Sequence, residues 1–170
     1  PSPKVVATMR DVEAHAAGRY PDVEAEALRH RIAGLHGVAP DQVVLGCGSG
    51  ELLRMAIDAF SGPQKTILAA LPTFELIGQY ARRAGAEVVG VPLSSDYSHD
   101  VSAMLARIDA ATAMVYICNP NNHTGSLTRR QDLERLLREL PANVYVLIDE
   151  AYHHYVGSSA DYASFIDRPV

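Results

Sequence analysis

Short apolar runs alternate with longer amphipathic segments along most of the 170 residues, and this alternation limits the possible folds more than any other feature. Apolar residues at helical spacing predict helices, whereas short aliphatic runs between turn residues predict buried strands. The predicted helices span residues 4–17, 23–36, 51–60, 74–84, 101–108 and 128–140, and the predicted strands span residues 43–45, 66–70, 86–91, 113–118 and 144–148. This order predicts an α/β fold of three layers, in which helices cover both faces of a mainly parallel sheet.

The composition suits one ordinary globular domain, because 48% of the residues are hydrophobic and 21% are charged. The net charge of −5 is spread along the chain without a basic run, which argues against a nucleic-acid-binding protein. No apolar stretch reaches the roughly 20 residues that cross a bilayer, so we expect no membrane span. Cys47 and Cys118 are far apart in the sequence and are expected to be buried thiols in a reducing compartment, the cytoplasm.

Four segments with residues suited to ligand binding directly follow predicted strands. They are Gly46–Gly50, Leu71–Phe74, Asn119–Gly125 and Asp149–Tyr152. In α/β proteins with parallel sheets, ligands bind outside the carboxyl ends of the strands. The sequence therefore predicts one shared site that is built from these four segments.

The first two segments each allow a ligand-binding and a purely structural interpretation. Glycines in Gly46–Gly50 let the backbone approach a ligand, and the helix that follows presents free amides to an anion such as phosphate. A tight turn without a ligand explains these glycines equally well, and the segment fits neither the Walker A nor the dinucleotide-binding pattern. Phe74 either stacks on a planar ring or packs in the core.

The last two segments carry a stronger chemical signal. Three asparagines, a proline and a glycine within Asn119–Gly125 exceed the needs of a simple turn, and a polar ligand group is a good candidate partner. Asp149 follows a buried strand, where its charge requires a metal, a substrate amine or a protonated ring nitrogen. The structural alternative is that Asp149 caps a helix that begins near Glu150. Tyr152 is placed to offer its phenol to the same ligand.

Several weaker signals are interpreted structurally. Thr128 and Gln131 have the spacing of a capping box at the start of a helix. His153 and His154 lie beside Asp149, but no second cluster has metal-ligand spacing, so no metal site is predicted. Four further histidines are expected on the surface: His15, His30, His36 and His99.

In this order, the segments resemble the large domain of fold-type I aminotransferases, which depend on pyridoxal 5'-phosphate (PLP), and they are most similar to the histidinol-phosphate aminotransferase pattern. Asn119–Gly125 resembles the family signature Asn-Pro-Asn-Asn-Pro-Thr-Gly, and Asp149–Tyr152 resembles Asp-Glu-Ala-Tyr. Residues 43–53 look like the strand, loop and helix around the cofactor phosphate. Residues 1–4 and 19–22 are similar to the stretch near the family's amino terminus.

The resemblance implies roles for the residues around the cofactor ring. Asp149 holds the protonated pyridine nitrogen, so that the ring acts as an electron sink. Asn122 and Tyr152 bond the phenolic oxygen of the ring, and Phe74 stacks on its face.

For the phosphate, the resemblance implies bonds from the backbone amides of Gly48, Ser49 and Gly50. Tyr20 reaches the phosphate of the neighbouring subunit, which implies a homodimer with shared active sites. Residues 1–20 then form an amino-terminal helix and link, and residues 21–170 form part of the PLP-binding large domain, without the small carboxy-terminal domain.

The implied activity is transamination in amino-acid biosynthesis, from a small-molecule amino donor to a 2-oxo acid. The implied substrate is an amino acid or an amino-acid-like phosphate. A PLP-dependent decarboxylase or lyase of a phosphorylated amino acid is one alternative, and a non-catalytic binding domain is another.

The chain departs from the family pattern at two points. His123 stands where the signature has proline, and we expect a trans peptide bond between Asn122 and His123 because a cis bond without proline is costly. The lysine that links covalently to PLP has no match, since Lys4 and Lys65 are the only lysines and neither stands in the family's Ser/Thr-Lys pattern. We therefore expect a fragment of a longer enzyme that is inactive alone.

Overall fold

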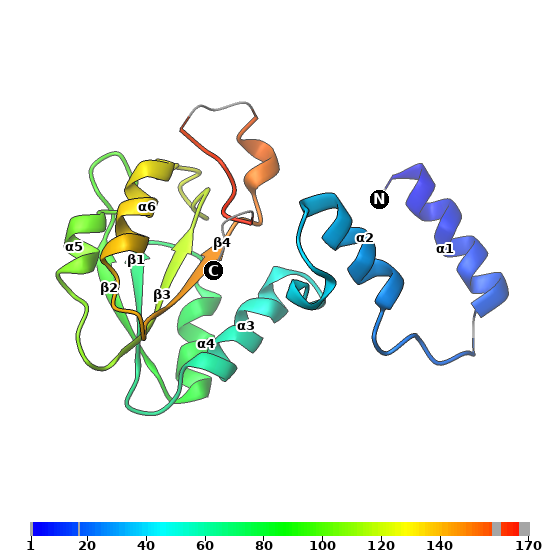
Figure 1. Cartoon of the computed structure of the whole chain (residues 1–170), viewed down its shortest axis with the longest axis horizontal. Coiled ribbons are helices and arrows are strands. Elements are labelled where there is room, and N and C mark those ends of the chain that lie inside the picture. The colour runs from blue at the N-terminus through cyan, green and yellow to red at the C-terminus, as the bar shows by residue number, and fades with distance from the viewer. Residues whose placement is uncertain (1, 17, 158–160, 167–170) are drawn as a thin grey trace. The chain divides into compact units, whose positions relative to one another are not determined.

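The computed structural model describes residues 2–16, 18–157 and 161–166 (Figure 1). The chain forms two compact units, Pro1–Val43 and Val44–Val170. The expected domain division between residues 20 and 21 falls inside the first unit and stays a prediction.

The described residues of the first unit form two α-helices and one 3-10 helix. These are α1 (Pro3–Ala16), α2 (Glu26–His36) and η1 (Pro40–Gln42). The Asp22 carboxylate accepts the backbone N–H groups of Glu24 and Glu26, both at 3.1 Å, and so holds the turn that leads into α2. Arg29 of α2 donates to the carbonyl of Pro40 at 2.9 Å, which joins α2 to η1.

The second unit is built around a four-stranded parallel sheet with the order β2-β1-β3-β4. The strands are β1 (Thr66–Leu71), β2 (Glu87–Pro92), β3 (Thr112–Cys118) and β4 (Tyr145–Asp149). The helices are α3 (Ser49–Phe60), α4 (Leu76–Ala84), α5 (Val101–Leu105), α6 (Arg130–Glu139) and the 3-10 helix η2 (His153–Tyr155). The predicted α/β class with a parallel sheet is confirmed.

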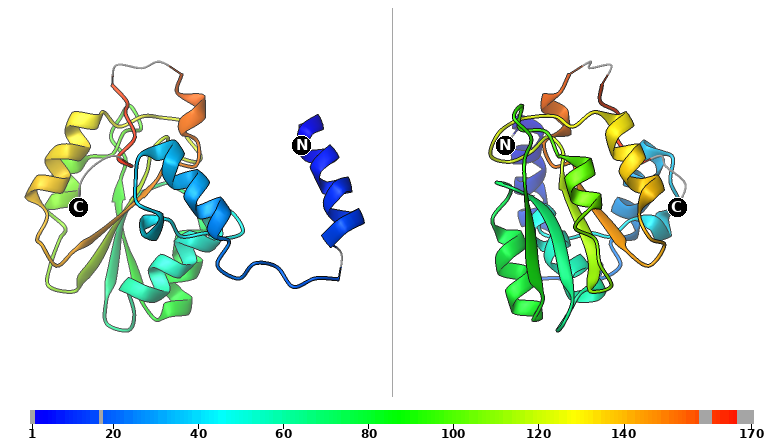
Figure 2. Two further views of the ribbon diagram at one scale, coloured as in Figure 1. Left: turned by 45° about the vertical axis from the view of Figure 1, so that its right-hand side comes forward. Right: turned by 90° about the vertical axis from the view of Figure 1, so that its left-hand side faces the viewer.

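Helices cover both faces of this sheet (Figures 1 and 2). On one face, Ile57 of α3 and Ile77 of α4 share a buried cluster with Ile67 of β1. On the other face, the buried residues of α5 and α6 form a second cluster with Leu68 of β1. Ile67 and Leu68 serve opposite faces because side chains alternate along a strand. The inner strand β3 is buried along its whole length.

Two predicted local structures are wrong. Residues 43–45 form no strand, and Val44 is 61% exposed, because no strand of the described chain pairs with this segment. The predicted capping box at Thr128 is absent, since the N-cap of α6 is Arg129 and makes no side-chain cap bond. The Thr128 hydroxyl is engaged elsewhere and accepts the backbone N–H of His99 at 2.8 Å.

Two predictions about burial are also wrong, one for His99 and one for Cys47. His99 is not on the surface but only 5% exposed, and its Nδ1 lies 2.6 Å from Thr128 Oγ1. Burial lowers the pKa of His99 to about 4, so the ring is neutral at neutral pH. Cys47 is exposed because it precedes α3 in an open loop, whereas Cys118 is buried as expected.

Candidate functional site

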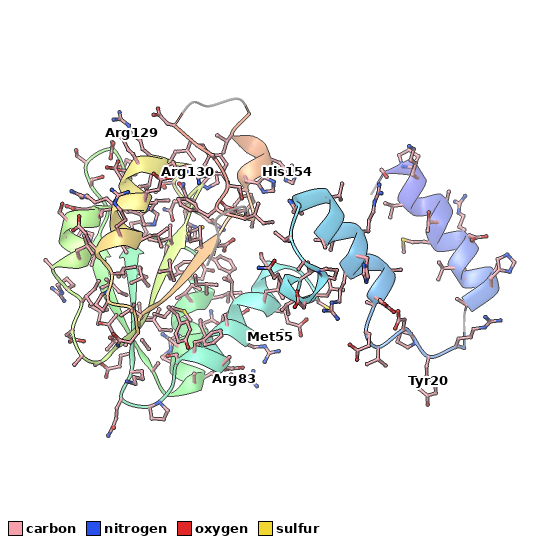
Figure 3. The ribbon with its side chains drawn as sticks, viewed as in Figure 1. Tyr20, Met55, Arg83, Arg129, Arg130 and His154 are labelled. Atoms are coloured by element: carbon pink, nitrogen blue, oxygen red, sulfur yellow. The ribbon has the colours of Figure 1, made fainter. Side chains whose placement is uncertain are left out.

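The carboxyl ends of β1, β3 and β4 and the start of α3 meet around a small cavity of about 50 Å³. Its lining includes five of the eight residues that the sequence predicts for the site: Ser49, Phe74, Asn122, Asp149 and Tyr152. Gly48 and Gly50 flank Ser49 in the chain. Tyr20 belongs to the first compact unit, where it is 99% exposed (Figure 3).

The first turn of α3 presents backbone amides at the cavity, whereas the N–H of Gly48, just before the helix, donates to the carbonyl of Gly46 at 2.9 Å. Gly48 has φ 82° and ψ 171°, a conformation that is open almost only to glycine, and α3 begins at the next residue. Glu51 folds back and accepts the N–H of Cys47 at 2.7 Å, a bond that lowers the pKa of Glu51. The first amides of a helix lack intrahelical acceptors, so the amides of Ser49 and Gly50 remain available to an anion.

Asp149, the last residue of β4, is a buried carboxylate that is 8% exposed. Its Oδ2 accepts the hydroxyl of Tyr116 at 3.0 Å, and its Oδ1 accepts the N–H of Ala151 at 3.0 Å. The second bond serves the local turn, but no helix begins at Glu150, so the capping alternative explains only one oxygen. Within the described ranges, no cation pairs with Asp149. Its charge therefore calls for a cationic ligand group.

The three asparagines of the loop after β3 have different tasks. Asn119 bonds both backbone polar groups of Thr128, at 2.9 and 3.0 Å. Asn121 accepts the hydroxyl of Thr73 at 2.8 Å, which ties the loop to the segment after β1. Asn122 alone has a side chain without a hydrogen-bond partner in the described chain, and it lines the cavity. Of the three asparagines, Asn122 is therefore the one whose side chain can bind a polar ligand group.

Two residues of β3 support the cavity from beneath, and the sequence reasoning missed both roles. Tyr116 is 1% exposed, and burial, followed by the proximity of Cys118 and Asp149, raises its pKa, so the phenol keeps its proton. The Cys118 sulfur accepts the N–H of Asn122 at 3.4 Å. One signal was available: a tyrosine inside a buried strand needs a partner for its hydroxyl.

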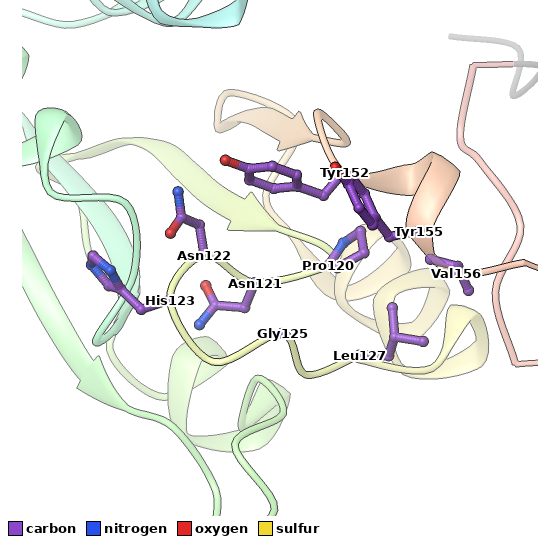
Figure 4. Close-up of a pocket in the computed structure, with 9 residues that line it drawn as sticks. All are labelled: Pro120, Asn121, Asn122, His123, Gly125, Leu127, Tyr152, Tyr155 and Val156. Carbon is purple, nitrogen blue, oxygen red and sulfur yellow. The ribbon is translucent and has the colours of Figure 1, made fainter.

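A larger pocket of about 510 Å³ adjoins the cavity (Figure 4). It is lined by Pro120, Asn121, Asn122, His123, Gly125, Leu127, Tyr152, Tyr155 and Val156. Asn122 and Tyr152 belong to both linings, so the two spaces are direct neighbours. At its rim, His123 Nε2 lies 3.4 Å from Glu75 Oε2, with both side chains more than half exposed. The peptide bond between Asn122 and His123 is trans, as predicted.

The described part of the second unit brings no lysine to the cavity. Lys65 is exposed and precedes β1, at the amino end of the sheet, whereas the cavity lies at the carboxyl ends. Lys4 belongs to α1 of the first unit. Among the described residues, no group of three or more histidines, cysteines or carboxylates is arranged to hold a metal ion. No helix in the same ranges is both long and apolar enough to cross a membrane.

The donor set of the cavity suits one kind of ligand. A buried carboxylate without a cation suits a protonated ring nitrogen, and the ring of Phe74 suits a flat heterocycle. Among the described residues, no hydrogen bond engages the Asn122 amide or the Tyr152 hydroxyl, and these groups suit a polar ring substituent. The start of α3 suits a phosphate. These groups fit PLP.

Comparisons with known proteins agree with this fit. The family model for aminotransferase class I and II matches residues 1–169. A histidinol-phosphate aminotransferase from Erythrobacter litoralis is 40% identical over 146 residues, which make up 86% of this chain and 40% of the relative. An aromatic amino acid aminotransferase from Rhodococcus jostii is 40% identical over 161 residues, or 95% of this chain and 45% of the relative.

Solved structures show the same architecture. Histidinol-phosphate aminotransferase from Sinorhizobium meliloti, in complex with pyridoxal-5'-phosphate, has a TM-score of 0.83 and 25% identity over 90% of this chain and 41% of its own. The chain thus spans less than half the length of these relatives.

Proposed function

The chain belongs to the class I and II aminotransferase family, and we propose that the whole protein transfers amino groups with PLP as its cofactor. A small-molecule amino donor and a 2-oxo acid are its partners. Relatives that are 40% identical include a histidinol-phosphate and an aromatic amino acid aminotransferase. We therefore propose the substrate class no more narrowly than an amino acid or an amino-acid-like phosphate.

The observation that carries this proposal is the buried carboxylate of Asp149, which has two donors but no cation in the described chain. When bound, PLP supplies an electron sink for the amino-acid substrate. Asp149 holds the proton on the ring nitrogen, because a negative charge at that position raises the nitrogen's pKa. Phe74 orients the ring from one face, and Asn122 and Tyr152 bond its phenolic oxygen. The backbone amides of Ser49 and Gly50 hold the phosphate.

We propose further that the whole protein is a cytoplasmic homodimer in which Tyr20 reaches the phosphate in the neighbouring subunit. The exposure of Tyr20 in its own unit, 99%, leaves its phenol available for such a contact. Mixing a Tyr20→Phe protein with an Asp149→Asn protein tests this arrangement. Each heterodimer then contains one site with both wild-type residues, so the mixture is expected to exceed the mean activity of the two separate variants. A mixture that only averages them would contradict the shared site.

Spectroscopy and a coupled assay of the whole protein test the function. The wild type is expected to show a PLP absorption band that borohydride fixes covalently, and to convert a 2-oxo acid to its amino acid without releasing carbon dioxide. Asp149→Asn is expected to weaken PLP binding by about ten- to a hundredfold, which corresponds to loss of a charged hydrogen bond. Glu139→Gln, at the exposed end of α6, is the control. A wild-type protein that binds no PLP would sink the proposal.

A further inference from the structure

A hydrogen bond joins Tyr116 to Asp149 on the core side of the cavity. The phenol of Tyr116 donates to Asp149 Oδ2 at 3.0 Å, while Ala151 N–H donates to Oδ1 at the same distance. Tyr116 is 1% exposed, whereas Asp149 lines the cavity. The hydroxyl therefore approaches the carboxylate from the interior and leaves the open side of the carboxylate to a ligand.

We propose that Tyr116 is a positioning residue for the cofactor, which holds the Asp149 carboxylate in the orientation that receives the ring nitrogen. This inference rests on the proposed function, because it assumes that Asp149 meets that nitrogen. Tyr116 itself touches neither cofactor nor substrate in this arrangement.

The position of Tyr116 on β3 explains how it can hold the carboxylate. In the parallel register, Tyr116 pairs with Leu147 and Cys118 pairs with Asp149. Tyr116 therefore stands one strand away and two residues before Asp149, on the same face of the sheet. Its ring is fixed within the buried cluster of the α3 and α4 face, so the hydroxyl has little freedom to move. With one donor on each oxygen, rotation of the carboxylate would break a bond.

The protonation states of the neighbouring groups keep Tyr116 as the donor in its hydrogen bond to Asp149. Burial raises the pKa values of both Tyr116 and Cys118, so the phenol remains a donor and the thiol remains neutral. Tyr152 is the other titratable group in the described lining of the cavity. Asp149 therefore stays the acceptor and Tyr116 the donor of the hydrogen bond between them.

Binding of pyridoxamine 5'-phosphate to the whole protein tests the inference without an activity assay. This ligand contains the same ring but forms no covalent link to a lysine. Tyr116→Phe removes only the hydroxyl and is expected to raise the dissociation constant about tenfold, as expected for a lost hydrogen bond to a charged group. For an analogue in which C–H replaces the ring nitrogen, the same substitution is expected to change the dissociation constant less than about twofold, because Asp149 then has no partner to receive.

Two further variants separate positioning from general support of the fold. Tyr145→Phe makes the same chemical change on β4, at a half-exposed ring that stacks on Phe60 at 4.3 Å, and is expected to leave both affinities unchanged. In an Asp149→Asn background, Tyr116→Phe is expected to cause no further loss. The comparison of the two backgrounds remains valid if Tyr116→Phe lowers the melting temperature. A general loss of stability would affect binding in both backgrounds, whereas a loss of positioning would affect binding only where Asp149 is present.

Each outcome bears on a different statement. Equal weakening for both ligands would show that Tyr116 only shapes the cavity and would overturn the inference, as would no weakening for either. If the wild-type protein binds both ligands equally, Asp149 makes no important contact with the ring nitrogen. That result would overturn the inference about Tyr116 but would leave PLP as the proposed cofactor. A wild-type protein that binds neither would overturn the proposed function itself.

Discussion

The side-chain amide of Asn119 holds both backbone polar groups of Thr128: Oδ1 accepts its N–H at 2.9 Å, and Nδ2 donates to its carbonyl at 3.0 Å. Both residues are buried, and they stand at the two ends of the loop that carries Asn122. The amide thus closes this loop in the way that a backbone bridge would.

Loss of this closure is expected to reduce stability. Asn119→Ala leaves a buried N–H and a buried carbonyl of Thr128 unpaired, so the free energy of unfolding is expected to fall by about 3 kcal/mol. Asn122→Ala in the same loop is the control, expected to change it by less than about 0.5 kcal/mol while weakening PLP binding. Urea denaturation and PLP titration of both variants measure these effects. Equal losses of stability would contradict the assigned division of tasks.

His99 is expected to make stability depend on pH. Its pKa is about 4 in the folded protein and 6.5 in its ordinary state, so the unfolded chain takes up a proton first as the pH falls. The stabilisation is therefore complete above about pH 6.5, declines as the pH falls toward 4 and then levels off. Between pH 7 and 5, the wild type is expected to lose about 2 kcal/mol more than His99→Gln, measured by urea denaturation. Parallel curves would show that His99 titrates normally.

Two glycines beside the cavity are expected to respond oppositely to alanine. Gly48→Ala puts a side chain at φ 82° and is expected to cost about 2 kcal/mol, although no atom lies within 4 Å of the added Cβ. Gly50 lies inside α3, and its added Cβ would meet the Tyr80 hydroxyl at 3.6 Å, an ordinary contact. Gly50→Ala is therefore expected to be neutral or to stabilise the protein by up to about 1 kcal/mol. Thermal unfolding of the two variants measures these effects. If Gly48→Ala does not lower the stability, the backbone at this position can relax to another conformation.

Glu150 is expected to hold the segment around Phe165 against α6 and β4. Its Oε1 accepts the Tyr162 hydroxyl and the Phe165 N–H, both at 3.2 Å, and its Oε2 accepts the Ser164 hydroxyl. Glu150→Ala removes these charge-assisted bonds and is expected to increase chymotrypsin cleavage at Phe165 by about tenfold or more, because local opening becomes easier. Glu139→Ala, at an exposed position of α6, serves as the control. Unchanged cleavage would mean that other contacts hold the segment.

The alternation of strands and helices could be predicted because the sheet is parallel and covered on both faces, so its inner strands are mainly apolar runs. Residues 43–45 have the same apolar character but form no strand. A strand requires a neighbour to pair with, and the sequence cannot state whether one is present. The capping box predicted at Thr128 is absent for a similar reason. The Thr128 hydroxyl is already hydrogen-bonded to His99, a partner that the local sequence does not indicate.

The residues around the cavity could be predicted from position, because each stands just after a strand or at the start of a helix. The contacts that support them could not. Tyr116 and Asp149 are 33 residues apart, and His99 and Thr128 are 29 residues apart. Such pairs depend on the register of neighbouring strands and on loop paths, which local patterns do not encode. The burial of His99 was missed because its partner, Thr128, is distant in the sequence.

The closed loop after β3 also affects what a ligand must accomplish when it binds. Asn119 and Asn121 hold the loop through bonds to the chain itself, so its shape does not depend on a ligand. Ordering a flexible backbone costs about 1–2 kcal/mol of conformational entropy per residue, and a loose loop would impose that cost at each binding event. Here the cost is met when the protein folds. The contacts of Asn122 with its ligand can therefore contribute almost in full to affinity.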